Sequence, residues 1–298
     1  MSTSPVGRFA PSPSGRMHLG NLFTALLAWL SVRSENGVFL LRIEDLDPER
    51  SRVEYADAIR DDLRWLGIDW DREQPPQSAR TEVYRSRFSY LASAAQVYPC
   101  YCTRAELSAA APHGGERVYP GTCRKRLAPP AGRRPSYRLT VPDRDISFSD
   151  GVWGVRTENL LRDCGDFVLC RSDGVFAYQL AVVTDDMEGG VTQVVRGRDL
   201  LPSTARQMYL YELFGAEPPT YFHVPLLTDG EGRRLSKRDK DLDMGVLRER
   251  MTPQALLGVL AFAAGLTERN EPLTAAELIP LFSWQKIKKQ DIPIREAF

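Results

Sequence analysis

Two short segments of the 298-residue chain carry residues suited to holding phosphate groups. The first runs from Arg8 to Asn21, where small residues let a ligand approach the backbone and His18 precedes an apolar stretch that predicts a helix. A histidine and the unpaired N–H groups of a helix N-terminus both attract phosphate oxygens. The second segment, residues 233–238, places four cations beside glycines, which suits a clamp on a polyphosphate. The alternatives are a proline-rich turn with a surface histidine and a solvated charged loop.

Metal chemistry is suggested by three of the five cysteines, which lie near one another in the sequence: Cys100, Cys102 and Cys123. Three thiolates and one further ligand complete the tetrahedral shell of a structural zinc ion. By side-chain chemistry alone the fourth ligand would be His113, whereas the alternative is a set of free thiols in a reducing compartment. Cys164 and Cys170 stand in apolar stretches that predict core strands.

Composition limits the class of protein. The 39 basic and 39 acidic residues give a net charge of zero, which excludes a globally basic nucleic-acid binder but not a local basic face. With 43% hydrophobic and 26% charged residues, the chain falls near the globular average. The longest apolar stretch, residues 22–30, is too short to span a bilayer, and the first residues lack the features of a secretory signal. A cytoplasmic protein is therefore expected.

The elements around the first segment predict a parallel α/β sheet. Strands are expected at Val6–Ala10 and Val38–Ile43, and the second is apolar nearly throughout, as strands buried on both faces are. Between them Leu22–Val32 predicts a buried helix with Gly20 or Asn21 near its cap. Ligands of parallel sheets bind beyond the carboxyl ends of the strands, so the residues that follow these two strands should lie close together.

The rest of the chain predicts more of this sheet, an insertion and a helical end. The segment 98–165 is loop-rich and contains a basic stretch, which indicates an insertion, and from about residue 241 the pattern is helical. The expected boundaries are strands at Gln193–Arg196 and Phe222–Leu227, a helix capped by Ser203 or Thr204 that reaches Phe214, and a helix from Thr252-Pro253 to Gly265.

The motifs, in this order, resemble those of class I aminoacyl-tRNA synthetases. His18-Leu19-Gly20-Asn21 is similar to their first signature, HIGH, and residues 234–238 (RLSKR) are similar to the second, KMSKS. The surrounding Arg8–Gly15 and Arg42–Asp45 resemble the glutamyl/glutaminyl subgroup specifically, and the similarity covers roughly residues 5–245. Three positions depart from the two signatures, as is common in the glutamyl subgroup: Asn21, Arg234 and Arg238.

The resemblance implies a Rossmann-type, parallel-sheet catalytic domain over residues 1–240, with an inserted zinc-containing subdomain at about 98–165. Residues 241–298 would form a short helical region, and because the chain ends about 60 residues beyond the second signature, no anticodon-binding domain is expected. The chain therefore resembles the glutamyl-queuosine tRNA(Asp) synthetases, a family of truncated paralogues. Such enzymes use ATP to activate glutamate and attach it to the queuosine base in the anticodon loop of tRNA(Asp). This implies a monomeric enzyme whose partners are ATP with Mg²⁺, L-glutamate and queuosine-containing tRNA(Asp).

The resemblance also implies an amino-acid pocket. Arg8 and Arg196 would contact glutamate, Glu44 would bind its α-ammonium group, and Ser12 and Tyr178 would add hydrogen bonds. Arginine suits a carboxylate because its planar fork pairs with both oxygens. The residues alone leave other interpretations open: a solvated acid or Mg²⁺ ligand for Glu44, a half-buried aromatic for Tyr178, and an ion pair with Asp199 for Arg196.

For ATP, the resemblance implies contacts from both signatures: His18, Gly20, Asn21, Ser236 and Lys237. His18 and Lys237 would be the catalytic residues, His18 by holding phosphates and Lys237 by neutralising charge between the α- and β-phosphates. The resemblance also makes Tyr119 the fourth zinc ligand in place of His113. Several basic residues are candidates for contacting tRNA: Arg124, Lys125, Arg126, Arg133, Arg134, Lys286, Lys288 and Lys289.

Two other functions are open at the level of sequence. One is a truncated glutamyl-tRNA synthetase that charges the 3′ end of a tRNA, and the other is a non-catalytic tRNA-binding paralogue. The intact signatures argue against the second, since a protein without ATP chemistry need not keep His18 or Lys237.

Overall fold

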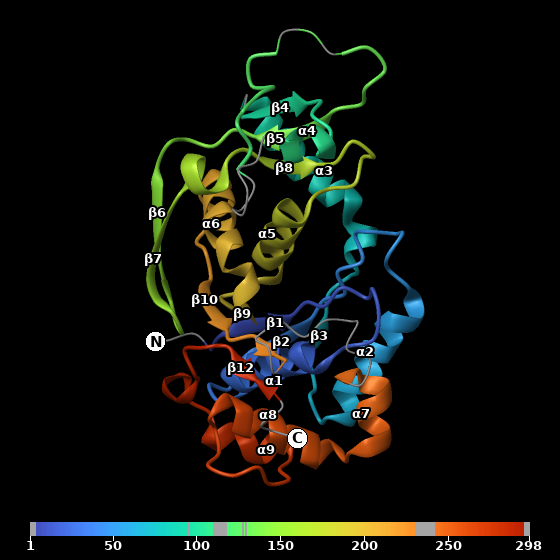
Figure 1. Ribbon diagram of the computed structural model, residues 1–298, viewed down its shortest axis with the longest axis vertical. Helices are drawn as coiled ribbons and strands as arrows, with labels where there is room; N and C mark the ends of the chain where they lie inside the picture. The colour runs from blue at the N-terminus through green and yellow to red at the C-terminus, as the bar shows by residue number, and fades with distance from the viewer. Residues whose placement is uncertain are drawn as a thin grey trace.

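The computed structural model of the protein describes residues 4–94, 96–109, 118–126, 128, 130–229 and 242–294. Its centre is a seven-stranded sheet in the order β3-β2-β1-β9-β10-β6-β7. Neighbouring strands pair in parallel except β6 and β7, which form an antiparallel hairpin at one edge (Figure 1). The strands are β1 (Val6–Phe9), β2 (Val38–Leu41), β3 (Arg72–Glu73), β6 (Asp145–Asp150), β7 (Gly154–Asn159), β9 (Gln193–Gly197) and β10 (Thr220–Val224).

Helices cover both faces of this sheet, which confirms the Rossmann-like α/β prediction. Neighbouring residues of a strand point to opposite faces of the sheet and so belong to separate parts of the core. Phe39 and Val195 pack with α1 and the C-terminal helices on one face, whereas Leu40 and Val194 face α6 on the other. Figure 1 shows α5 and α6 above the sheet and α8 and α9 below it. The helices are α1 (Leu19–Arg33), α2 (Val53–Trp65), α3 (Thr81–Ser93), α5 (Tyr178–Gly189), α6 (Thr204–Leu213), α7 (Met244–Arg250), α8 (Pro253–Ala264) and α9 (Ala275–Leu278).

A smaller antiparallel sheet, in the order β4-β5-β8, lies at the far end of the molecule, at the top of Figure 1. The segment 98–165 contributes to both sheets, since it supplies β5 and most of β4 in the small sheet and the whole β6–β7 hairpin of the large one. The elements of this part are β4 (Val97–Cys100), α4 (Arg104–Ala109), β5 (Ser136–Leu139) and β8 (Phe167–Cys170).

Beyond β10 the chain continues into a separate two-stranded sheet. The strand expected at Phe222–Leu227 stops before Pro225, because proline has no N–H to donate to the ladder. Leu227–Thr228 then forms β11, which pairs in parallel with β12 (Ile292–Pro293). The C-terminal strand thus lies against the chain that leads into residues 230–241, which contain the second signature.

Two further local expectations need correction. α6 begins at the expected place, but Ser203 does not cap it, because the 3₁₀-helix Arg198–Ser203 runs directly into α6. The Ser203 hydroxyl instead accepts a hydrogen bond from Gln179 at 3.0 Å. Cys164 is buried as expected, but it ends the π-helical turn Leu160–Cys164 and not a strand.

The helical prediction for the C-terminal part is confirmed in α8. Thr252 accepts a hydrogen bond from the N–H of Ala255, Pro253 occupies the first turn, and Gly265 ends the helix with a φ of 87°, a region that favours glycine. Over the part of the chain that the structure describes, no helix is both long and apolar enough to cross a membrane. Shorter helical turns lie at Gln77–Arg80, Ile279–Leu281 and Trp284–Lys286.

Candidate active site

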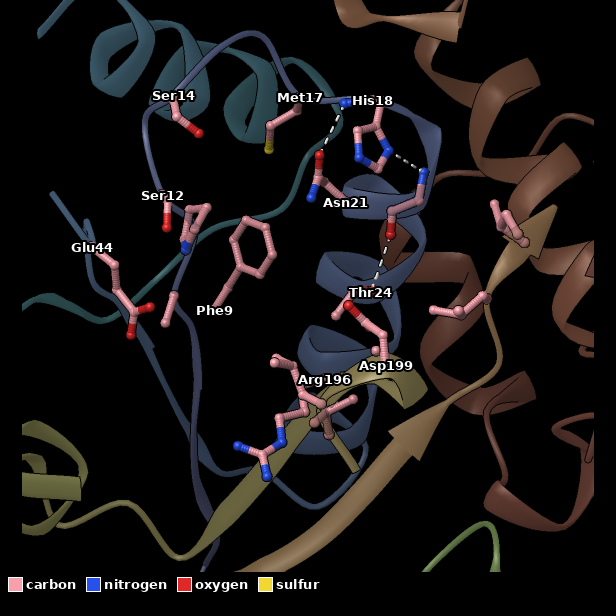
Figure 2. A pocket seen from close by; sticks show the side chains of 18 of the residues that line it. Phe9, Ser12, Ser14, Met17, His18, Asn21, Thr24, Glu44, Arg196 and Asp199 are labelled. Carbon is pink, nitrogen blue, oxygen red and sulfur yellow. Dashed lines mark hydrogen bonds between the residues drawn. The ribbon is translucent and has the colours of Figure 1, made fainter. Parts of the chain in front are cut away.

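A cavity of about 410 Å³ opens at the carboxyl ends of β2, β1 and β9. β1 lies between the other two strands in the sheet, and the order of the strands along the chain reverses at β1, which is where parallel α/β sheets bind their ligands. Figure 2 shows His18 at the opposite end of this cavity from Arg196, with Glu44 to one side. Ser236 and Lys237 lie outside the described residues. All the other residues predicted to bind glutamate or ATP line the cavity: Arg8, Ser12, His18, Gly20, Asn21, Glu44, Tyr178 and Arg196.

At the His18 end of the cavity, α1 begins earlier than the sequence predicted. His18 is the capping residue, and not Gly20 or Asn21: its Nδ1 accepts from the Gly20 N–H at 3.1 Å. The Asn21 side chain in turn accepts from the His18 N–H at 3.1 Å. An imidazole nitrogen here fills the position that a serine or aspartate oxygen usually takes. Because Nδ1 accepts, a neutral His18 carries its proton on Nε2 and is a donor there.

A buried network of opposite charges forms the cavity wall around Arg8 and Glu44. Arg42, which is fully buried, donates to Asp186 at 2.6 Å and to Glu44 at 3.1 Å. The Arg8 Nε lies 3.3 Å from an oxygen of the same Asp186. Glu44 is 9% exposed and fixed by Arg42, so it is not a solvated surface acid. Sequence reasoning did not assign a role to Arg42 or Asp186.

Burial and these ion pairs compete in setting the charge of the two acids. Burial raises the pKa of Glu44, against the opposing effects of Arg42 and Arg8. Burial also opposes ionisation of Asp186, but Arg42 and Arg8 outweigh it and lower the pKa of Asp186. Asp186 is therefore a fixed negative charge. The ionised form of Glu44 would be stabilised further by any cation that a ligand brings into the cavity.

Arg196, on β9, is 4% exposed and held by three neutral groups. Its Nε donates to His223 at 2.9 Å, and its two terminal nitrogens donate to Gln207 at 2.6 Å and to Thr204 at 2.9 Å. Asp199 is thus not among these hydrogen-bond partners, although one interpretation of the sequence paired it with Arg196. A buried guanidinium with neutral partners, lining a cavity, suits an anionic ligand group.

His223 is fully buried between Asp150 and Arg196. Its Nδ1 lies 2.6 Å from Asp150, and its Nε2 accepts from Arg196, so the ring proton belongs on Nδ1. Burial, opposed in part by Asp150, lowers the pKa of His223 to about 4. A neutral His223 therefore fixes Arg196 without adding charge. Sequence reasoning missed this residue, whose only signal was a histidine within a predicted strand.

The predicted metal ligands converge beside the small sheet. The Sγ atoms of Cys100, Cys102 and Cys123 all lie within 4.8 Å of one another, and those of Cys102 and Cys123 are 3.7 Å apart. The Tyr119 hydroxyl lies 3.4 Å from Cys100 and 3.8 Å from Cys102. Ligands around a tetrahedral zinc ion, at about 2.3 Å for sulfur and about 2.0 Å for oxygen, would be separated by about 3.5–3.8 Å. The donors and their spacing fit one metal ion, while His113 lies outside the described residues.

The surroundings of this cysteine–tyrosine cluster favour a thiolate at Cys123 alone, because burial raises the pKa of Cys102 to about 11 and also raises the pKa of Tyr119. The Arg138 guanidinium lies 3.8 Å from the centre of the Tyr119 ring, and the Cys123 N–H donates to the Tyr119 oxygen at 2.8 Å. Burial opposes ionisation of Cys123, but hydrogen bonds, among them those from Tyr101 and Tyr119, lower the pKa of its thiol to about 7. Within the described residues, this is the only place where three cysteine, histidine or acidic side chains could share an ion.

Comparison with known proteins identifies the family. The family of tRNA synthetases class I (E and Q), catalytic domain, matches residues 6–293. The chain belongs to this synthetase family. The synthetase is 49% identical over 297 residues to the Glutamyl-Q tRNA(Asp) synthetase of Nitratidesulfovibrio vulgaris, which covers 93% of this chain and 91% of that protein. It is 46% identical to the protein of the same name from Symbiobacterium thermophilum, over 97% of this chain and 95% of that protein.

Solved structures agree with this assignment. A glutamate tRNA ligase from Elizabethkingia meningosepticum, crystallised in complex with its amino acid, matches 99% of the synthetase with a TM-score of 0.84 and 28% identity. The match covers 68% of that ligase. Mycobacterium tuberculosis methionyl-tRNA synthetase matches with a TM-score of 0.56 and 14% identity, which shows a shared fold. The predicted class I synthetase fold is therefore confirmed.

The basic residues considered for tRNA binding lie in different surroundings in the synthetase. Arg124 pairs with the buried Asp166, so its charge is neutralised inside the fold. Arg133 pairs with Glu106 at 3.0 Å, and Lys286 donates to a backbone carbonyl at 3.0 Å. The remaining candidates are exposed: Lys125, Arg126, Arg134, Lys288 and Lys289.

Proposed function

We propose that the synthetase uses ATP to activate glutamate and transfers the glutamyl group to the queuosine base in the anticodon loop of tRNA(Asp). The observation that carries the proposal is the amino-acid end of the cavity. There Arg196, whose hydrogen-bond partners within the described residues are all neutral, lines the same space as Glu44. A buried cation and a buried acid suit the carboxylate and ammonium groups of an acidic amino acid. The names of relatives that are 46–49% identical support the acceptor.

In this pocket, Arg8 and Arg196 would bind the carboxylates of glutamate, and Glu44 would bind its ammonium group. Ser12 and Tyr178, which line the same cavity, would add hydrogen bonds. Glutamine would be disfavoured, because its neutral amide leaves the buried Arg196 without a counter-charge, at a cost of about 1–3 kcal/mol.

In the first step the α-carboxylate of glutamate attacks the α-phosphorus of ATP, giving glutamyl-adenylate and pyrophosphate, so no protein nucleophile is needed. The Nε2–H of His18 and the N-terminus of α1 would hold phosphate oxygens, while Asn21 keeps His18 oriented and Gly20 leaves room for the nucleotide. Ser236 and Lys237 would bind phosphates, as the second signature implies. Mg²⁺ bound with ATP supplies further charge neutralisation.

In the second step a hydroxyl of the queuosine ring attacks the activated carbonyl, and AMP leaves. Because the reaction needs ATP and tRNA, we place it in the cytoplasm. We also propose that residues 1–240 are the catalytic domain, that residues 241–298 are a helical region, and that the enzyme is a monomer.

We propose further that the cysteine–tyrosine cluster holds one zinc ion with a structural role. Its four donors come from two short stretches of the chain, residues 100–102 and residues 119–123. The ion would therefore tie Cys100 and Cys102 to Tyr119 and Cys123. The inserted segment 98–165 would then keep its shape without contributing to the chemistry of activation.

Two measurements test the proposed reaction. Exchange of pyrophosphate into ATP should require glutamate and should not occur with glutamine. Labelled glutamate should transfer to tRNA(Asp) that carries queuosine and not to the same tRNA without it. Transfer to the 3′ end of tRNA(Glu) would instead identify a 3′-charging enzyme, and the absence of any glutamate-dependent exchange would identify a non-catalytic paralogue.

A variant tests the observation that carries the proposal. Arg196→Lys keeps the charge but loses the planar fork, so the KM for glutamate should rise about tenfold or more, the equivalent of about 1.4 kcal/mol. Arg250→Lys, an exposed position on α7, is the matched control and should leave this KM unchanged. Equal KM values for the two variants would contradict the assignment of Arg196.

A further inference from the structure

A second cavity, of about 350 Å³, adjoins the first and shares Asp199 and Leu226 with it. It lies between the β6–β7 hairpin and the 3₁₀-helix that precedes α6. Its occupant would therefore lie next to the contents of the glutamate and ATP cavity. The rest of its lining comes from residues with no role in the activation step: Trp153, Arg156, Arg198, Leu201 and Pro202.

Trp153 gives this second cavity a fixed aromatic surface. Its indole N–H donates to the backbone carbonyl of His223 at 2.7 Å, which restrains the ring. The Arg198 guanidinium lies 5.1 Å from the ring centre and is itself paired with Asp291. An immobilised aromatic ring beside a guanidinium is the kind of surface on which unstacked nucleobases pack.

Arg156 adds a positive charge at the rim of the second cavity. It is exposed on β7 and lies opposite Phe148 of β6, whose burial shows that the pair shares the inner face of the hairpin. Its neighbour Val155 is 76% exposed and belongs to the other face. Over the described part of the chain, Arg156 has no hydrogen-bond or ion-pair partner. Its guanidinium is thus available for a phosphate.

We propose that the second cavity binds one unstacked nucleotide of the acceptor RNA, with its base on Trp153 and its backbone phosphate at Arg156. This rests on the proposed function, because the transfer step must bring an RNA hydroxyl next to the activated amino acid. The wall shared through Asp199 and Leu226 provides that adjacency. Base stacking and a phosphate contact do not depend on base identity, so this cavity places the strand and does not select the modified base.

The test measures RNA binding and ATP use separately, since ATP also carries a base and phosphates. The probe is a fluorescent anticodon stem-loop with queuosine, and its Kd is measured by anisotropy. Arg156→Ala should raise this Kd about five- to tenfold, as expected for loss of one charged hydrogen bond. It should also make the dependence of log Kd on log salt shallower by about 0.7, the value for one phosphate contact in a single strand. The KM for ATP in pyrophosphate exchange should stay unchanged.

Two variants serve as controls. Val155→Glu changes the net charge by the same amount as Arg156→Ala but on the other face of β7, and it should leave the Kd for the stem-loop unchanged. Arg156→Lys keeps a cation at the rim and should recover most of the lost affinity.

An unchanged Kd in Arg156→Ala would overturn the proposal, as would an equal loss in Val155→Glu. A raised KM for ATP would assign the second cavity to the nucleotide instead. Failure of the proposed function would give a different result. The wild-type protein would then show no glutamate-dependent exchange or no transfer, whatever the Kd values of the variants.

Discussion

Replacing His223 with leucine should weaken glutamate binding without altering the residues that line the cavity. The His223 Nε2 accepts the Arg196 Nε–H at 2.9 Å, and both side chains are buried. Leucine leaves that N–H without an acceptor, which costs about 1–3 kcal/mol for a buried donor. Part of this cost lowers the free energy of unfolding. The rest weakens glutamate binding, because the Arg196 guanidinium is no longer held in its orientation. If all of it fell on binding, the KM for glutamate would rise about 5- to 150-fold.

The assay is pyrophosphate exchange at saturating ATP over a range of glutamate concentrations. For His223→Leu we expect a KM for glutamate raised about fivefold or more and an unchanged KM for ATP. His223→Gln is the matched control, because its amide oxygen offers Arg196 an acceptor and should restore most of the affinity. Circular dichroism establishes that each variant is folded. A folded His223→Leu enzyme with the wild-type KM for glutamate would refute the argument that His223 positions Arg196.

Three further predictions concern titration, charge and metal. The free energy of unfolding should fall by about 2 kcal/mol from pH 7 to pH 5, because the unfolded chain protonates His223 near pH 6.5 whereas the folded protein does so only near pH 4. Urea unfolding at both pH values checks this, and His223→Gln should lose less; an equal loss would contradict it. Glu44→Gln should raise the KM for glutamate about tenfold, while Asp47→Asn, outside the cavity, should not; matching KM values would remove Glu44 from the pocket. Purified protein should release about one zinc ion per chain to a chelator in a colorimetric assay, and Tyr119→Phe should release it faster with glutamate-dependent exchange intact. Protein that contains no zinc would argue against the site.

Much of the cavity could be predicted because its residues stand in contiguous motifs at the ends of strands. Arg8 lies in β1 and Glu44 follows β2; both strands were predicted, the second from its apolar run. The start of α1 was placed too late, because cap preferences favour small polar residues and did not suggest His18.

The supports of the cavity could not be predicted, because they depend on contacts between distant segments. Arg42 stood inside a recognised motif, but its partner Asp186 is 144 residues away. His223 acts only through Asp150 and Arg196, which the sheet order brings together from three strands. Tyr119 came from the family resemblance, since side-chain chemistry alone favoured a histidine.

The pairing of β11 with β12 has a practical consequence for studying this enzyme. The last described strand runs alongside the chain that enters the segment assigned to ATP. A dye attached near residue 290, which is exposed, would lie beside Leu226, a residue of the cavity lining whose N–H donates to Asp291 at 3.0 Å, without altering any residue of the cavity. Residue 290 is therefore a suitable position for an optical reporter of cavity occupancy.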